Sequence, residues 1–95
     1  MKAIFKYKIS FEDINNISMP KGSEVLTVQI DEKTNSPCIW ALVDTDVQET
    51  VVRLFALYGT GHPLMEHSDQ KYIGTFQYQN GDFVGHIFEL TELKF

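Results

Sequence analysis

Residues 72–90 read YIGTFQYQNGDFVGHIFEL, and this stretch decides the fold. Two apolar runs, residues 72–78 and 83–90, flank the pair Asn80-Gly81. An Asn-Gly pair between apolar runs is the strongest short signal for a β-hairpin, because both residues tolerate positive φ. The stretch therefore predicts two antiparallel strands joined at Asn80-Gly81.

Upstream of this hairpin, period-two patterns predict further strands. Residues 3–11 alternate apolar and polar side chains, which is typical of a strand with one buried face. A weaker extended segment at 14–19 leads into a turn at residues 20–22, where Pro and Gly suit the required φ angles. The next strand covers residues 24–30. Residues 38–43 are apolar throughout, which indicates a strand buried on both faces.

Residues 47–58 fit two patterns. Val47, Val51 and Leu54 lie on one helical stripe, whereas Val51, Arg53 and Phe55 alternate as in a strand. The β-branched run at residues 50–52 favours a strand, because branched side chains lose rotamers in a helix. We therefore expect a strand, with a helix as the alternative, and the longest loop at residues 59–70.

These elements predict one domain over residues 1–95, a length that suits a single domain. Six to seven short strands at this spacing predict an all-β fold, either a small antiparallel sandwich or a partly open barrel.

Charge and cysteine content narrow the classes of function and location. The formal net charge of −5 argues against nucleic-acid binding and against adsorption to anionic membranes. The single cysteine, Cys38, cannot form an intramolecular disulfide, which favours a reducing compartment. Lysines interrupt the apolar residues near the N-terminus, and no apolar run approaches the length of a membrane span. We expect a cytoplasmic protein.

The most informative segment for function is Tyr58-Gly59-Thr60-Gly61-His62, followed by Pro63. Two glycines around one threonine allow successive amide N–H groups to converge into an anion-binding nest. The Thr60 hydroxyl and the His62 imidazole would then add hydrogen bonds to a phosphate or carboxylate. The alternative is a tight turn that leaves the preceding strand, with Pro63 stiffening its exit.

Three further side chains are candidates for binding the same ligand. Arg53 is the sole arginine, and its guanidinium suits an anion, although an ordinary surface arginine is an equal alternative. Trp40 could stack on a base, although a core tryptophan is the simpler interpretation. His86, between Gly85 and Ile87, completes the predicted set and could equally be a structural histidine.

No pattern predicts catalysis, a metal or a cofactor. His62 and His67 share a loop with Asp69, but their spacing is loose and Cys38 is remote in the sequence. No nucleophile-elbow motif surrounds any serine. We therefore expect a protein that is not an enzyme, with no catalytic residue and no metal site.

Several blocks of the sequence resemble a family of small proteins from tailed phages and prophages. The resemblance rests on residues 1–2, 4–7, 20–22, 26, 28–29 and 40–44, then on the motif Tyr58-Gly59-Thr60-Gly61-His62-Pro63, and finally on residues 72–77, 86 and 88–89. The family carries no established activity, so the resemblance implies origin and the host cytoplasm rather than a mechanism. Small phage accessory proteins frequently counter host defences, and some sequester nucleotide signals.

Two hypotheses for function follow. The first is a non-catalytic protein that binds a small anionic, nucleotide-like ligand, with sequestration of a host defence signal as one use. The second is a protein-interaction module that inhibits a host or phage protein through its acidic and aromatic surface. We also expect a homo-oligomer, because flat apolar strands in so short a chain leave surface that one small core does not cover.

Overall fold

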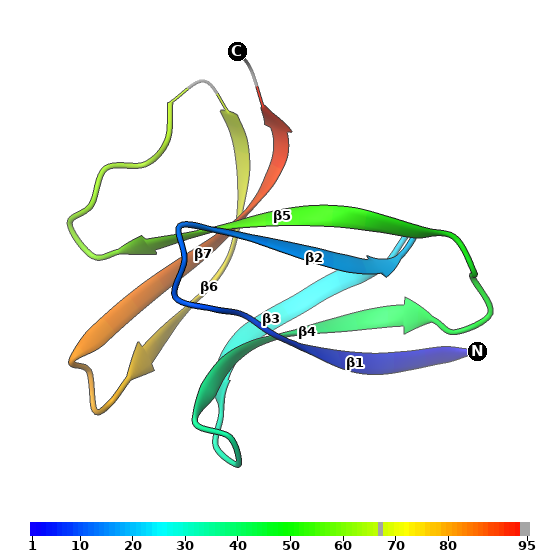
Figure 1. Cartoon of the computed structure of the whole chain (residues 1–95), viewed down its shortest axis with the longest axis horizontal. Coiled ribbons are helices and arrows are strands. Elements are labelled where there is room, and N and C mark those ends of the chain that lie inside the picture. Colours follow the sequence, from blue (N-terminus) through cyan, green and yellow to red (C-terminus); the bar gives the residue numbers. More distant parts are fainter. Residues whose placement is uncertain (67, 94–95) are drawn as a thin grey trace.

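The computed structural model describes residues 1–66 and 68–93, and every regular element in these ranges is a β-strand. The strands are β1 (Lys2–Lys8), β2 (Ile14–Pro20), β3 (Glu24–Asp31), β4 (Ser36–Asp44), β5 (Thr50–Gly59), β6 (Ser68–Tyr78) and β7 (Phe83–Leu93). All pairs are antiparallel. The strand order is β1-β4-β3 in sheet A and β2-β5-β7-β6 in sheet B (Figure 1). The predicted all-β, antiparallel fold is confirmed, and the two sheets do not close into a barrel.

The hairpin predicted at Asn80-Gly81 joins β6 to β7. Its strands pair up to Tyr78 opposite Phe83, so four residues form the connection. Gln79, Asn80 and Gly81 have φ angles of 52°, 58° and 91°. Asparagine and glycine tolerate this left-handed region, which explains why the pair occurs at the turn.

The segment that fitted either a helix or a strand forms β5, a central strand of sheet B. It pairs with β2 on one side and with β7 on the other. Phe55 points into the core with 0% exposure, while Val52 on the opposite face of the sheet is 64% exposed. The strand prediction is confirmed, because the segment pairs with a neighbouring strand on each side and its side chains point to opposite faces.

The first strand is shorter than the period-two pattern predicted, since β1 ends at Lys8 and not at residue 11. The Asn15 side chain explains where it ends. Its Oδ1 atom accepts hydrogen bonds from the Ser10 backbone N–H at 2.8 Å and from the Ser10 hydroxyl at 3.0 Å, and its Nδ2 donates to the Ser10 carbonyl. These local bonds replace ladder bonds and turn the chain. Phe11 consequently lies in the connection, where it is 51% exposed.

The core lies between the inner faces of the two sheets. It is built by Ile9, Ile17, Met19, Val28, Ile39, Phe55, Leu57, Phe76 and Ile87. β3 and β6 approach closely at one side, where a Cβ atom added to Gly74 would lie 2.9 Å from Val28 Cγ1. No helix in the described ranges is long and apolar enough to cross a membrane.

The outer face of sheet A explains the environment of the single cysteine. Cys38 lies on the central strand β4 and is 2% exposed. Lys6 on β1 donates a hydrogen bond to Asp31 at the end of β3, with 2.7 Å between Nζ and Oδ2. Because β1 and β3 flank β4, the Lys6 side chain crosses β4 beside Cys38.

We expect Cys38 to react slowly with thiol reagents in the folded protein. Burial raises the pKa of its thiol, and the Asp31 carboxylate raises it further, so less of the reactive thiolate is present near neutral pH. Labelling at pH 7.5 should be at least about tenfold slower than in denaturant. Equal labelling rates for the folded and denatured protein would contradict this placement.

Candidate functional site

The segment after β5 forms a tight turn. The His62 backbone N–H donates a hydrogen bond to the Gly59 carbonyl at 3.1 Å. Gly61 has a φ of 89°, a conformation that side-chain-bearing residues rarely adopt, as the third position of a type II turn requires. The His62 amide N–H therefore bonds within the turn. An anion-binding nest at this turn would have to use the amide N–H groups of Thr60 and Gly61.

The position of His62 depends on the absence of a side chain at Gly59. A Cβ atom added to Gly59 would lie 3.0 Å from Cε1 and 3.1 Å from Nδ1 of the His62 ring. Glycine at this position lets the imidazole fold back against the end of β5. His62 is thereby placed at the end of the molecule where the β1–β2 connection and the β6–β7 turn also lie.

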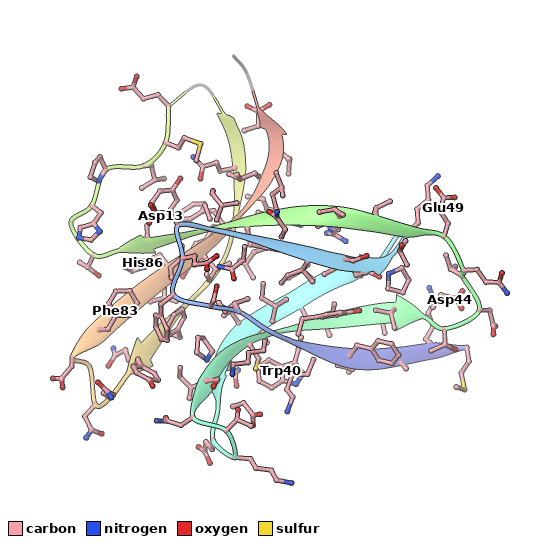
Figure 2. All side chains as sticks on the ribbon, viewed as in Figure 1. Asp13, Trp40, Asp44, Glu49, Phe83 and His86 are labelled. Carbon is pink, nitrogen blue, oxygen red and sulfur yellow. The ribbon has the colours of Figure 1, made fainter. Side chains whose placement is uncertain are left out.

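Three adjacent hollows share His62 in their lining, and we call them together the His62 groove. Their volumes are ≈380, ≈310 and ≈280 Å³. The side chains that distinguish them come from three separate segments of the chain: Phe11 and Asp13, then His62, Leu64 and Met65, and finally Asp82 and Phe83. In Figure 2, Asp13 and Phe83 lie toward the same end of the molecule.

Aromatic rings form one wall of the His62 groove. Phe11 packs against three rings, with centroid distances of 5.0 Å to Tyr78, 5.6 Å to Phe83 and 6.3 Å to Phe76. These tilted and edge-to-face arrangements are the ones that ring quadrupoles favour. The three ring contacts hold Phe11 in place. Phe11 is nevertheless 51% exposed, so one side of its ring faces solvent.

Two carboxylates give the groove its charge. Asp13 is fixed by its backbone, since its carbonyl accepts a hydrogen bond from the Leu57 N–H at 2.9 Å. Asp82 belongs to the β6–β7 turn. Neither carboxylate bonds to another residue within the described part of the chain, and no lysine or arginine described there lines any of the three hollows. The potential of the groove is therefore negative.

Three of the predicted ligand-binding residues meet on the outer face of sheet B. Tyr58 and His86 are cross-strand partners. The Thr60 hydroxyl lies 2.7 Å from His86 Nε2, and the Thr75 hydroxyl lies 2.9 Å from His86 Nδ1. Both imidazole nitrogens therefore have hydroxyl partners. The Tyr72 hydroxyl lies 2.6 Å from the Thr75 hydroxyl and extends this row of hydrogen-bonded side chains.

Arg53 lies on the inner face of sheet B and is already neutralised. Its Nε donates to Glu89 Oε2 at 2.6 Å, and its Nη2 donates to Glu89 Oε1 at 2.8 Å. Its Nη1 donates to the Ser23 carbonyl. The hydrogen bonds that Arg53 donates to Glu89 raise the pKa of the guanidinium. This bidentate pair connects β5, β7 and the β2–β3 turn, well away from the His62 turn.

Trp40 lies on sheet A, where its cross-strand partners are Lys6 and Thr27. It is half-buried on the outer face of that sheet, and Figure 2 shows it far from Asp13, Phe83 and His86. The structure thus brings Tyr58, Thr60 and His86 together and places Gly59 beside His62. It leaves Arg53 and Trp40 at separate sites.

Sequence reasoning missed most of the lining of the His62 groove. Phe11 was expected at the end of the first strand, and Asp13 was not among the predicted ligand-binding residues. The pair Asn80-Gly81 was the available signal for Asp82 and Phe83, because a hairpin tip must lie at the end of sheet B. The pair says nothing of which other connections lie beside that tip. Within residues 1–66 and 68–93, no three His, Cys, Asp or Glu residues gather as metal ligands.

Comparison with known proteins identifies the family to which the chain belongs. A family model described as a domain of unknown function (DUF7352) matches residues 1–94. No curated protein and no solved structure matches the chain. The resemblance to tailed-phage proteins stays a prediction. Because the family model covers nearly the whole sequence, the chain belongs to the DUF7352 family.

Proposed function

We propose that this protein is a non-catalytic interaction module whose His62 groove receives a basic segment of a protein partner. The single observation that carries the proposal is the pairing of two unbonded carboxylates, Asp13 and Asp82, with the exposed Phe11 ring in one groove. Such a groove attracts a lysine or arginine and at the same time buries apolar side chains next to it.

The electrostatics of the groove favour a cation over a nucleotide. A phosphate at His62 would lie in the negative potential of Asp13 and Asp82 without a lysine or arginine, among the described residues, to offset it. The only arginine is held by Glu89 and Ser23. Binding of a nucleotide-like anion at residues 58–62 stays a prediction that the experiment below also tests.

The shape of the groove supports an extended partner rather than an enclosed small molecule. Pockets for small molecules usually hold roughly 300–1,000 Å³ and bury most of the ligand. Two of the hollows, of ≈380 and ≈310 Å³, lie at the lower end of that range, and the third, of ≈280 Å³, lies just below it, so the distinction rests on their arrangement and not on their volume. All three lie around one exposed imidazole and are lined by three chain segments. A peptide or loop that places successive side chains in adjacent hollows fits this arrangement.

We expect a fluorescent peptide that alternates lysine with leucine and tryptophan to bind the wild type more tightly than a matched glutamate peptide. Asp13→Asn combined with Asp82→Asn should weaken binding of the lysine peptide by about twofold to thirtyfold, because each exposed ion pair contributes roughly 0.2–1 kcal/mol. Fluorescence anisotropy at low and high salt measures this, and salt should weaken wild-type binding.

The matched control is Glu12→Gln combined with Glu32→Gln, which changes the net charge equally outside the groove. It should bind the lysine peptide nearly as well as the wild type. Equal affinity for the lysine and glutamate peptides would contradict the proposal. So would binding of a nucleotide in a panel of cyclic and linear nucleotides that is lost in His62→Ala, since that result supports the anion-binding alternative.

A further inference from the structure

The outer face of sheet B carries no Asp, Glu, Lys or Arg at its described outward positions. Its inward and outward positions follow from the cross-strand register, with Phe55 and Ile87 fully buried on the inner face. The outward positions are the even-numbered residues 14–18 of β2, 52–58 of β5 and 84–90 of β7, together with Gln70, Tyr72, Thr75 and Gln77 of β6. None of these described positions is Asp, Glu, Lys or Arg. We call this surface the uncharged face.

The outer face of sheet A, in contrast, carries several charged side chains. The outer face of sheet A carries Lys2, Lys6 and Lys8 from β1, Asp44 from β4, and Glu24 and Asp31 from β3. A solvent-facing sheet ordinarily alternates apolar residues inside with polar and charged residues outside, as sheet A does. In a chain with 22% charged residues, a four-stranded face that has none at its described outward positions is typical of a surface that is covered.

Exposed apolar groups lie on the uncharged face. Val52 is 64% exposed and Tyr72 is 56% exposed. Tyr72 packs edge-to-face on Phe88 at 5.4 Å, and Phe88 packs similarly on Tyr58 at 5.7 Å, so a row of rings crosses three strands. Leu64, 49% exposed, belongs to the segment whose Met65 N–H bonds the Tyr58 hydroxyl, so it adds apolar surface near the row.

The strand edges are poorly suited to pairing with another chain. Lysines at residues 2, 6 and 8 occupy the outer edge of sheet A on β1, and Pro20 ends the edge strand β2. The other two edge strands carry register shifts, at Val25/Thr27 in β3 and at Tyr72/Gly74 in β6. Lysine, proline and bulges on edges all oppose extension of a sheet by a neighbour. Association through a sheet face does not require pairing at these edges.

We propose that the uncharged face packs against the same face of a second copy of this chain, forming a two-fold symmetric dimer. In a two-fold interface each surface must complement itself, and residues near the axis meet their own counterparts. Charged positions near the axis would meet like charges, which opposes association there. A face without charged side chains at its described outward positions satisfies the symmetry. It borders the His62 groove, because Ile14, Ala56 and Tyr58 of this face also line the first hollow.

The test compares two nearly identical substitutions on opposite sheets. Val52 on the uncharged face and Ile4 on sheet A are both β-branched strand residues, with 64% and 62% exposure. Sedimentation equilibrium of the wild type should give about twice 10.9 kDa at high micromolar concentration. Val52→Lys should raise the dimer dissociation constant by about tenfold or more, since it places like charges in the interface, whereas Ile4→Lys should leave it unchanged.

Tyr72→Lys is a second variant on the far side of the same face, and circular dichroism confirms that each variant folds. Because the interface is uncharged, high salt should not dissociate the wild-type dimer. A wild type that stays monomeric at every concentration would overturn the proposal. A dimer that resists both Val52→Lys and Tyr72→Lys, or that dissociates with Ile4→Lys or with salt, would overturn it as well.

Discussion

Gly85→Val should lower the free energy of unfolding by about 3 kcal/mol, because the core has no room for a side chain at this position. A Cβ atom at Gly85 would lie 2.5 Å from Cζ and 2.7 Å from Cε1 of Phe76, and 2.9 Å from Leu57 Cδ1. Phe76 is 3% exposed and Leu57 is 9% exposed, so neither ring nor methyl group can move into solvent. Urea unfolding followed by circular dichroism measures the change.

Gly22→Ala is the control for the loss of glycine itself. Gly22 has a φ of 84°, and no atom lies within 4 Å of the position that a Cβ would take. Its substitution should therefore cost only the backbone strain of a left-handed residue, about 1 kcal/mol. If Gly85→Val were no more destabilising than Gly22→Ala, the close packing of β7 against Phe76 would be wrong.

Arg53→Met should destabilise the fold by a similar amount, about 3 kcal/mol. The side chains of Arg53 and Glu89 are 21% and 11% exposed. Removal of the guanidinium leaves the Glu89 carboxylate poorly hydrated and without its two hydrogen bonds, and it also leaves the Ser23 carbonyl without that donor. Leaving a largely buried charge without its partner is what makes such a change costly.

The double variant Arg53→Met, Glu89→Leu distinguishes the loss of the pair from the loss of packing. Replacing both partners by apolar groups of similar size removes the buried charge, so the double variant should unfold at a higher urea concentration than Arg53→Met alone. A double variant as unstable as the sum of the two single variants would indicate that the ion pair itself contributes little coupling energy.

The fold could be predicted from the sequence because its signals are local. Alternation in residues 24–30, the apolar run 38–43 and the turn pair Asn80-Gly81 each specify a strand or a turn from neighbouring residues. The end of β1 could not be predicted in the same way. It depends on hydrogen bonds between Asn15 and Ser10, and a side chain that competes with the strand ladder leaves no trace in the period-two pattern.

The candidate site was harder to predict because it is assembled from distant segments. The motif at residues 58–63 drew attention to His62, but the charge of the site comes from Asp13 and Asp82, which lie 49 and 20 residues away along the chain. Arg53 alternates correctly with its neighbours as a strand residue, yet its partner Glu89 is 36 residues away and could not be identified from spacing. Charge complementarity of this kind appears only once the sheet register is known.

Chemical-shift mapping by NMR tests the central claim, binding of a basic segment in the His62 groove, most directly. A ¹⁵N-labelled sample is titrated with the lysine-containing peptide and, separately, with its glutamate counterpart. The account predicts saturable shifts from the lysine peptide at the amides of Phe11, Asp13, His62, Asp82 and Phe83, with little change at Trp40 on sheet A. Shifts centred on Trp40, or equal shifts from both peptides, would contradict it.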